Sequence, residues 1–228
     1  MEKTAFQQFL LGVKDELPIL VGVVPFGMIY GILALGAGLS RFDAQAMSAV
    51  IFAGSSQFMM VQLIRESTTW LVILMTGFII NLRHALYSAT IAPYIRHLPR
   101  RWKALLAYLL TDEAFAVAAL HYQREGVTRF SHWYFLGAGL ALWTSWQVST
   151  AVGIFLGAQV PEAWGLDFTL PLTFIALVVP ALKDKAGVAT AIIASLTALL
   201  FLGLPYKLGL IVASALAIAA GMWVEARQ

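Results

Sequence analysis

The chain has 228 residues, of which 60% are hydrophobic and 12% are charged, and its formal net charge is +3. Soluble domains carry about 25% charged residues, so this composition excludes a soluble globular protein. The positive charges gather in loops, which fits control of membrane topology and argues against nucleic-acid binding. The chain has no cysteine, which excludes disulfides, thiol nucleophiles and cysteine-based metal sites, and we expect no cofactor.

Apolar runs of about 20 residues indicate membrane-spanning helices rather than the short alternating strands of a membrane barrel. We therefore predict an all-α integral membrane protein, one polytopic domain over residues 1–228, with about seven to eight transmembrane segments. Residues 1–16 form a short amphipathic lead-in, in which charges at Lys14, Asp15 and Glu16 interrupt any signal-peptide pattern. We expect the first span to be retained as its own insertion signal.

The first predicted span covers residues 17–39 and contains the sequence VPFGMIYG. Pro25 removes a backbone hydrogen bond, and Gly27 follows it closely. The span is therefore either a kinked helix or a helix with a functional break next to Phe26.

The second segment, residues 43–64, has a small and polar centre. Small residues and serines can serve helix packing alone, but a glutamine beside two serines at mid-depth exceeds what packing needs. We favour a discontinuous or re-entrant helix that lines a cavity. The central residues are Gly54, Ser55, Ser56 and Gln57, followed by Phe58 and Met59.

The third segment, residues 70–95, carries an arginine at its centre. Arg83 lies 13 residues from both Trp70 and Arg96, which is about 20 Å along a helix in a hydrocarbon core about 30 Å thick. An ionisable residue at that depth is a candidate functional residue. On a helical wheel its polar neighbours fall on one wide face, although the histidine alone would also fit a structural role. The face comprises Asn81, Arg83, His84, Tyr87 and Ser88.

The loop RHLPRRWK, residues 96–103, is the most basic in the chain and is predicted to be cytoplasmic. The apolar segment that follows, residues 102–120, is interrupted by Asp112 and Glu113 near the membrane midplane. We predict that Arg83 pairs with one of these carboxylates and that the other is free to bind a proton or a substrate amine. The alternative is a short helix that lifts both acids to the surface.

The remaining segments are simpler. The loop 157–167 has no lysine or arginine and is placed outside, and the apolar stretch 168–182 is short for a span. Further spans are predicted at residues 133–156, 186–202 and 208–224.

Full spans throughout do not give a consistent topology. Eight spans with a cytoplasmic N-terminus would place the basic loop outside, against its charge. Re-entrant or half-length segments among residues 43–64, 104–120 and 168–182 would remove the conflict, and such segments mark secondary-transporter binding sites. A weak echo between LPILVGVVPFG and LPLTFIALVVPAL is consistent with an inverted repeat.

Five stretches occur in order along the chain: VPFGMIYG, FAGSSQF, NLRHALYS, LTDEAFAV and GLDFTLPLTFIALVVP. Together they resemble the large subunit of AzlC/YgaZ-type branched-chain amino acid exporters, over nearly the whole chain. The resemblance implies a multi-pass protein of the bacterial inner (plasma) membrane that exports Val, Leu and Ile, and in some members Met. It also implies a separate small membrane subunit of AzlD/YgaH type as partner.

The residues agree with a zwitterionic substrate, which needs a cation, an anion and an apolar pocket. Arg83 or helix N-terminal amides near residues 54–57 would take its carboxylate, and Asp112 or Glu113 its amine. No P-loop sequence occurs, so we predict that the proton motive force drives export, with His84, Asp112 or Glu113 carrying the proton. The apolar pocket would comprise Phe26, Phe58, Met59 and Phe115.

Two other functions compete with this one. An intramembrane enzyme would use His84, Asp112 and Glu113, but the chain has no H-E-x-x-H, G-x-S-x-G or cysteine nucleophile, so we expect no enzyme. A passive channel for small polar solutes, or a structural subunit, could use the same residues. Coupling to an ion gradient separates a transporter from a channel.

Overall fold

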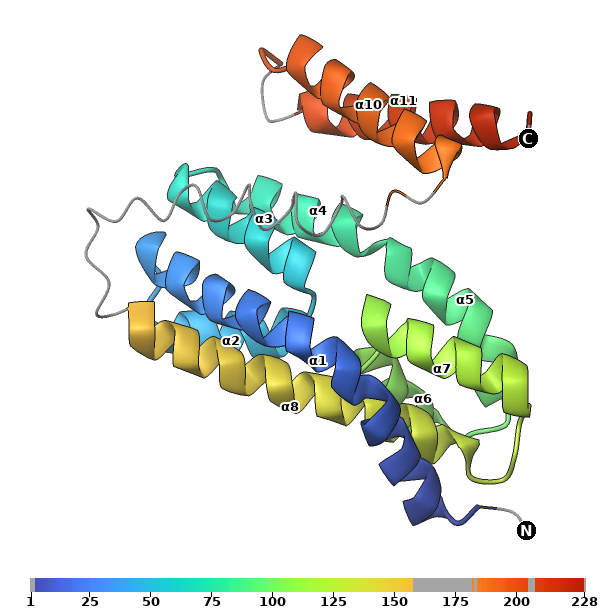
Figure 1. The fold of residues 1–228 in the computed structure, drawn as a ribbon. Coiled ribbons are helices and arrows are strands. Elements are labelled where there is room, and N and C mark those ends of the chain that lie inside the picture. Colours follow the sequence, from blue (N-terminus) through green and yellow to red (C-terminus); the bar gives the residue numbers. More distant parts are fainter. Residues whose placement is uncertain (1–2, 158–181, 183, 205–207, 228) are drawn as a thin grey trace. The chain divides into compact units, whose positions relative to one another are not determined.

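The chain is described by a computed structural model that covers residues 3–157, 182, 184–204 and 208–227 (Figure 1). The described residues form helices and loops without a strand, which confirms the all-α prediction. They divide into two compact units, Met1–Leu166 and Asp167–Gln228. That the two units form one domain stays a prediction.

Three helical stretches of the first unit are long and apolar enough to cross a membrane: α1, α4 together with α5, and α8. The other helices of this unit are about half that length. The bounds are α1 (Ala5–Gly36), α2 (Arg41–Ile51), α3 (Gly54–Arg65), α4 (Trp70–Asn81), α5 (Arg83–Ile95), α6 (Arg100–Tyr108), α7 (Asp112–Glu125) and α8 (Ser131–Gly157).

Two of the predicted segments are discontinuous, as their polar centres indicated. Phe52 ends α2 in a left-handed conformation (φ 41°), Ala53 is extended, and α3 begins at Gly54. The second interruption, at residues 109–111, separates α6 from α7. Thr111 caps α7 by accepting a hydrogen bond from the backbone N–H of Ala114. A new helix, α3 or α7, begins after each discontinuity, so its N-terminus lies inside the unit.

The contacts place both ends of the α6–α7 pair at the end of the unit where α1 and α8 begin. Trp102 of α6 contacts Trp133 at the start of α8, and Lys3 before α1 pairs with Glu125 at the end of α7. The C-terminal part of α5 lies at this end as well, because Tyr94 stacks on Tyr122 of α7.

The α2–α3 pair has both ends at the opposite end of the unit. α2 follows α1 directly, whereas α3 leads into the start of the α4–α5 stretch (Figure 1). Ser56 and Met60 of α3 lie against Gly77 of α4, as expected for two antiparallel neighbours. The two pairs are therefore half-length hairpins that enter the unit from opposite ends.

The core is built around α1 and α8, which run parallel and in close contact. Gly12 lies against Tyr134 and Gly31 against Thr150, so the helix backbones touch where side chains are missing. α1 continues through Pro25, so the predicted alternative of a helix break there is wrong. The proline removes only one backbone hydrogen bond, and α8 packs against α1 and supports it. The predicted lead-in before residue 17 is also wrong, since α1 already begins at Ala5 behind a Thr4 capping box.

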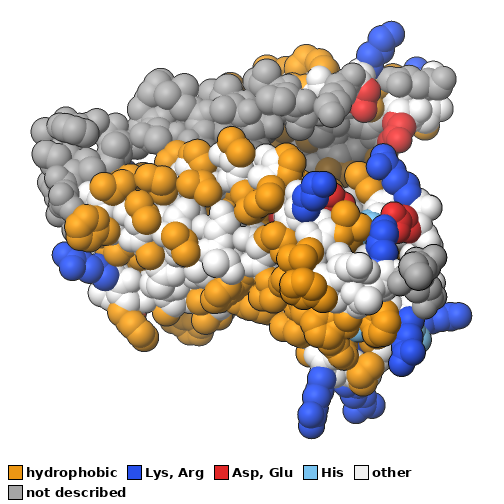
Figure 2. Space-filling view, turned by 60° about the horizontal axis from the view of Figure 1, so that its bottom comes forward, with side chains coloured by type: hydrophobic (Ala, Val, Ile, Leu, Met, Phe, Trp, Pro, Cys, Tyr) orange, Lys and Arg blue, Asp and Glu red, His pale blue; other side chains and the backbone are white. Residues whose placement is uncertain are grey.

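The surface of this unit is apolar where a soluble protein would be polar. Figure 2 shows hydrophobic side chains over a large part of one face, with most of the lysines and arginines at its margins. Exposed apolar residues recur along the three long stretches, as in Val21 (77%), Phe78 (63%) and Phe155 (66%). Such a surface fits contact with lipid.

The second unit contains two antiparallel helices, α10 (Lys185–Leu200) and α11 (Leu208–Glu225), at the positions of the last two predicted segments. That they cross the membrane stays a prediction, because both are shorter apolar helices. Gly221 of α11 packs against Thr190 of α10. The predicted segment 168–182, and with it the repeat echo, lies outside the described residues apart from residue 182.

Candidate functional site

Arg83 joins three separate parts of the first unit. Its Nη1 forms an ion pair with Oδ2 of Asp112 (2.7 Å), and its Nη2 donates a hydrogen bond to Oγ of Ser55 (2.6 Å). The side chains of Arg83 and Asp112 are 31% and 39% exposed, so the pair is partly accessible. The predicted pairing of Arg83 with one of the two acids is thus present, and the partner is Asp112.

The local backbone explains why these groups meet. Arg83 is the first residue of α5, Asp112 the first of α7, and Ser55 the second of α3. No side chain caps the N-terminus of α3, so no capping side chain accepts a hydrogen bond from its first backbone N–H groups. Two half-helices therefore turn their positive N-terminal ends toward one ion pair, which is the arrangement expected at a site for an anionic group.

Several polar atoms at this centre are buried without a hydrogen-bond partner. On the ion pair itself these are Nε of Arg83 and Oδ1 of Asp112. Oδ1 of Asn81, two residues before Arg83, is in the same condition, and so is Nε2 of Gln57, whose side chain lies beside Tyr30. Unpaired buried polar groups cost free energy, so a set that contains donors and acceptors together fits a site that receives a polar ligand.

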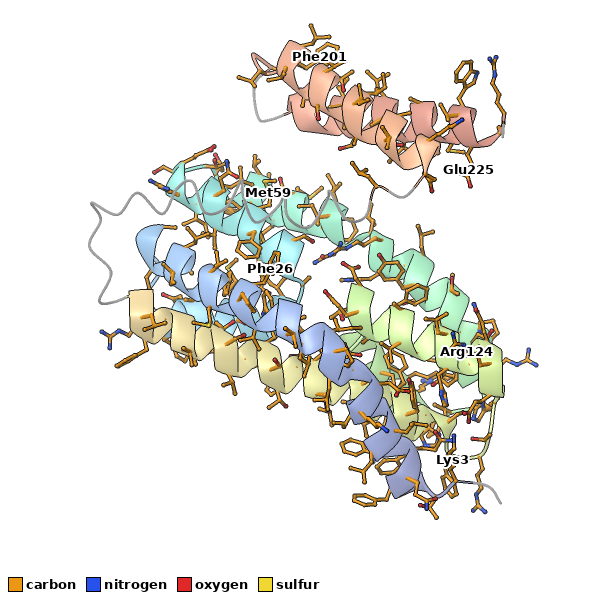
Figure 3. The ribbon with its side chains drawn as sticks, viewed as in Figure 1. Lys3, Phe26, Met59, Arg124, Phe201 and Glu225 are labelled. Carbon is orange, nitrogen blue, oxygen red and sulfur yellow. The ribbon has the colours of Figure 1, made fainter. Side chains whose placement is uncertain are left out.

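Aromatic rings adjoin the ion pair in two groups. Tyr87 of α5 stacks on Phe115 of α7 with ring centroids 4.5 Å apart, and His84 lies 5.8 Å from Tyr87. Phe26 and Phe58 form an edge contact at 6.1 Å, where α1 crosses α3 (Figure 3). The predicted apolar residues therefore belong to two clusters rather than to one pocket.

The other predicted residues have more structural surroundings. Ser56 donates to the carbonyl of Gly77, and the side-chain oxygen of Gln57 accepts from the backbone N–H of Ala53. Gly27 lies against Ser149 of α8, where a side chain would not fit. Gly54 lies against Trp146, Pro25 is exposed, and Met59 is half-buried on α3.

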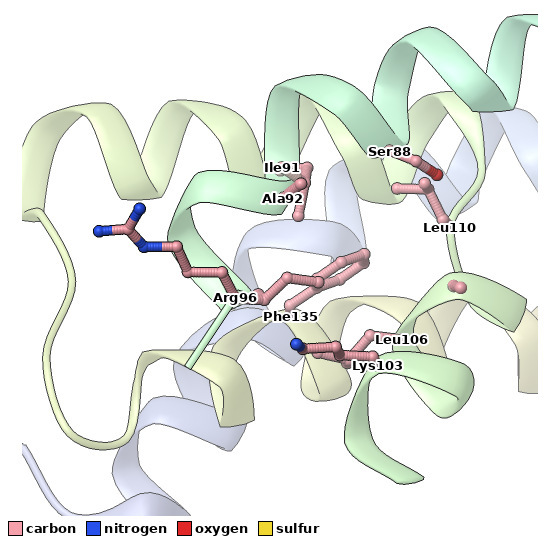
Figure 4. A pocket seen from close by; sticks show the side chains of 10 residues that line it. Ser88, Ile91, Ala92, Arg96, Lys103, Leu106, Leu110 and Phe135 are labelled. Carbon is pink, nitrogen blue, oxygen red and sulfur yellow. The ribbon is translucent and has the colours of Figure 1, made fainter. Parts of the chain in front are cut away.

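The predicted single polar face over residues 81–88 spans the junction of two helices. Asn81 ends α4 and Arg83 begins α5, and Leu82 between them keeps helical backbone angles (φ −56°, ψ −25°), so that Asn81 shares the face stays a prediction. Ser88 is exposed and lines a cavity between α5, α6 and α8 instead (Figure 4). The middle of the predicted face, Arg83 to Tyr87, lies next to Asp112 and Phe115 as expected.

The cavity in Figure 4 measures about 260 Å³ and is mainly apolar. Leu110, two residues before Asp112, lines it at one side, and Arg96 and Lys103 line it at the basic end of the unit. It therefore extends from near the ion pair toward the loop 96–103.

Sequence reasoning missed three residues of this region. Tyr30 and Trp146 are buried and stacked at 6.3 Å beside Phe58, and Glu16 is buried on α1. For Tyr30 and Glu16 the signal is the spacing of the buried positions of α1, most of which lie three or four residues apart. These positions are Gln8, Gly12, Glu16, Val23, Gly27, Tyr30, Gly31 and Ala34.

Comparison with known proteins identifies the family. The sequence profile described as "AzlC protein" matches residues 18–160, which is more than half of the chain and includes the ion pair and both discontinuous segments. The chain belongs to the AzlC family. This confirms the resemblance drawn from the five sequence stretches.

Relatives of this AzlC family member are membrane proteins. The inner membrane protein YgaZ of Escherichia coli is 28% identical over 86% of this chain and 83% of its own length. An uncharacterized membrane protein of Archaeoglobus fulgidus is 32% identical, covering 78% and 77% of the two chains. The branched-chain amino acid transport protein AzlC of Bacillus subtilis is 26% identical, covering 74% and 66%. No solved structure matches. The chain is a multi-pass membrane protein of a transport family.

Proposed function

We propose that this chain is the large subunit of a secondary exporter of branched-chain amino acids in the plasma membrane, driven by the proton motive force. The observation that carries the proposal is the Arg83–Asp112 pair between the N-termini of α3 and α7, with unpartnered atoms on both members. The name of the Bacillus subtilis relative supports the substrate class.

The pair has the two charges that a zwitterion requires. A substrate carboxylate would accept from the guanidinium of Arg83 and from the N-terminal amides of α3, next to Ser55. The substrate amine would donate to Asp112 at Oδ1, the oxygen that has no partner. The substrate would thus insert between two groups that pair with each other in its absence.

The substrate side chain needs an apolar surface close to these charges. The stacked rings of Tyr87 and Phe115 lie beside the ion pair. The cavity lined by Leu110 and Phe135 offers a path toward the basic end of the unit. Transfer of a branched aliphatic side chain from water to such surroundings lowers the free energy by about 25 cal/mol per Å² of apolar surface buried.

The two half-length hairpins offer a way to open the site to alternate sides. α3 belongs to the hairpin that enters from one end and α7 to the hairpin that enters from the other. Movement of either hairpin would expose the Arg83 centre to its own side only. We propose that the mobile proton is carried by His84, Asp112 or Glu113, and that a separate small AzlD/YgaH-type subunit completes the exporter.

Efflux from intact cells tests this function. Cells fed a Val- or Leu-containing dipeptide would express this chain alone, this chain with its small partner, or both with Asp112→Asn. We expect efflux only with both chains and its loss in Asp112→Asn. Asp43→Asn, which changes an exposed carboxylate of α2, is the matched control and should export normally. Absence of efflux of any neutral amino acid, despite good membrane expression of both chains, would overturn the proposal in favour of a channel.

Coupling is tested separately in vesicles loaded with valine. An exporter driven by protons should respond to an imposed pH gradient, whereas a passive channel should respond to the valine gradient alone. Valine efflux that ignores the pH gradient would remove proton coupling from the proposal.

A further inference from the structure

Glu16 is a charged residue in the interior of the first unit, on the face of α1 that includes Gln8 and Gly12. It is 0% exposed, and neither of its carboxyl oxygens has a hydrogen-bond partner. The side-chain oxygen of Gln8, two turns earlier on the same face, is also buried without a partner. An ionised carboxylate in such a place costs far more free energy than a neutral one, because no donor replaces the lost water.

The charged and titratable groups around Glu16 come from the helices that pack against α1, which are α2, α3, α7 and α8. Glu113 of α7 acts on Glu16 electrostatically, and Glu16 acts in the same way on Tyr134 of α8. Asp15, its exposed neighbour on α1, accepts a hydrogen bond from the hydroxyl of Tyr134 (2.8 Å). The ring and hydrogen-bond contacts of α2 and α3 with α1 lie more than two turns further on, at Phe26 and Tyr30. The ionisable group on a neighbouring helix that acts on Glu16 is therefore a second carboxyl, that of Glu113.

The two acids at the start of α7 have different surroundings. Asp112 forms the ion pair with Arg83 of α5. Glu113 is influenced by Asp112, Arg83 and the Thr111 hydroxyl, and it also acts on Glu16 of α1. Glu16 has no hydrogen-bond donor or cation as a partner among the described residues, so its ionisation beside a second carboxyl is costly, and a proton bound at this site removes that cost.

We propose that Glu16 and Glu113 form a proton-binding site between α1 and α7, separate from the Arg83–Asp112 pair. With one proton bound, the site carries a single negative charge and the helices pack closely. Loss of the proton leaves two negative charges, which repel each other and loosen the contact between α1 and α7.

The site can influence Arg83 through α7. Because Glu113 and Asp112 are adjacent in the first turn of α7, a displacement of this turn by repulsion at Glu113 moves Asp112 relative to Arg83. Proton release at one side of the helix would then weaken the ion pair at the other. This coupling to substrate rests on the proposed function, whereas proton binding itself does not.

Chemical labelling tests proton binding directly. Dicyclohexylcarbodiimide is an apolar reagent that reacts with protonated carboxyls in apolar surroundings. The full chain in liposomes would be labelled between about pH 6 and about pH 9 and mapped by mass spectrometry. We expect label on Glu16 or Glu113 that decreases as pH rises. Glu16→Gln should reduce it at least several-fold, whereas Asp15→Asn, the exposed neighbour, should not.

Two labelling results would overturn the proposal. The first is the absence of label on both Glu16 and Glu113 in the folded protein. The second is label that is insensitive to pH but is lost on addition of Na⁺ at constant pH, which would assign the site to a metal cation.

Transport distinguishes this inference from the proposed function. In vesicles that contain both subunits, Glu16→Gln should still exchange labelled valine for unlabelled valine, but net efflux should no longer respond to a pH gradient. Asp15→Asn should respond as the wild type does. A full response in Glu16→Gln would overturn the coupling role. If the wild type moved no amino acid while Glu16 showed pH-dependent labelling, the proton site would stand and the proposed substrate would be wrong.

Discussion

Arg83 is satisfied by two partners that come from different hairpins, Ser55 and Asp112. An arginine within a membrane protein must find such partners or face a cavity. Removal of one member leaves the other charge without compensation, which costs more than removal of both. The pair should therefore behave as a unit when it is mutated.

A double-mutant cycle measures this. We expect Arg83→Ala and Asp112→Ala each to lower the thermal stability of the purified protein, and the double variant to be more stable than the sum of the two effects predicts. The coupling should be about 0.5–3 kcal/mol, reduced toward the lower value by the partial exposure of both side chains. Independent, additive effects would contradict the pairing.

The ion pair of Lys3 with Glu125 is the matched control. Its N–O distance is similar (2.8 Å), but both side chains are more exposed. The coupling free energy between Lys3 and Glu125 should therefore be about 0–1 kcal/mol. The Lys3 ammonium lowers the pKa of the Glu125 carboxyl below its usual value of 4.5. The contribution of this pair is therefore complete at neutral pH and is lost as the pH falls through that lowered pKa, so both cycles are compared at about pH 7.

At the scale of elements, the interface of α1 with α8 depends on missing side chains. A Cβ on Gly31 would lie 2.5 Å from the carbonyl oxygen of Thr150 and 2.6 Å from the backbone nitrogen of Ile154. Backbone atoms cannot move aside as a flexible side chain can. We expect Gly31→Ala to destabilise the protein by about 1–3 kcal/mol, measured as a fall in melting temperature in detergent.

Gly22 gives the control on the same helix. A Cβ on Gly22 would meet no atom within 4 Å, and the residue is exposed. Gly22→Ala should leave stability unchanged or raise it by up to about 1 kcal/mol, since alanine favours the helix. Equal losses in both variants would show that the α1–α8 contact is not what limits stability.

Local signals predicted some elements and missed others for physical reasons. The discontinuity before Gly54 was visible because small and polar residues interrupt an apolar run there. The interruption at Leu82 was not, because Asn81 and Arg83 fit a continuous helix and no glycine or proline marks the position. Caps and turns are local, but a break in an apolar helix also depends on the neighbouring helices that compensate for it.

The same limit explains which site residues the sequence predicted and which it missed. That Arg83 pairs with Asp112 or Glu113 could be predicted, because these charges lie within apolar segments, where few partners exist. Which acid is the partner could not. Glu16 was assigned to an amphipathic lead-in, because it follows Lys14 and Asp15 in a run of three charged residues. The four-residue spacing of Gln8, Gly12 and Glu16 marks one face of α1, but it does not show that α7 and α8 pack against this face.

Most basic residues of the first unit lie at one end of it, although Arg41 and Arg65 flank the α2–α3 hairpin at the other end. The loop 96–103 lies at the same end of the unit as the start of α1, and so do Lys3 and Arg124 (Figure 3). The end of α8, before the acidic loop predicted to lie outside, is at the opposite end. By the positive-inside rule we predict that α1 starts in the cytoplasm, and this orientation removes the conflict found with eight full spans.

Cysteine accessibility tests this topology, since the natural chain has no cysteine. Four exposed positions near helix ends are suitable: Arg41→Cys and Thr69→Cys flank the α2–α3 hairpin, and His97→Cys and Val127→Cys flank the α6–α7 hairpin. A maleimide that cannot cross the membrane should label the first two from outside the cell. The other two should react only when the cytoplasmic side is opened.

The result depends on the hairpins themselves. If residues 41–65 crossed the membrane completely, Arg41→Cys and Thr69→Cys would react from opposite sides, and the half-length hairpin would be wrong. Ala118→Cys, a position with 0% exposure in α7, is the control and should stay unlabelled from both sides until the protein is denatured. If each flanking pair were labelled from one side only, the two hairpins would enter the membrane from opposite sides. The N-termini of α3 and α7, with Arg83 beside them, would then lie where the two hairpins meet.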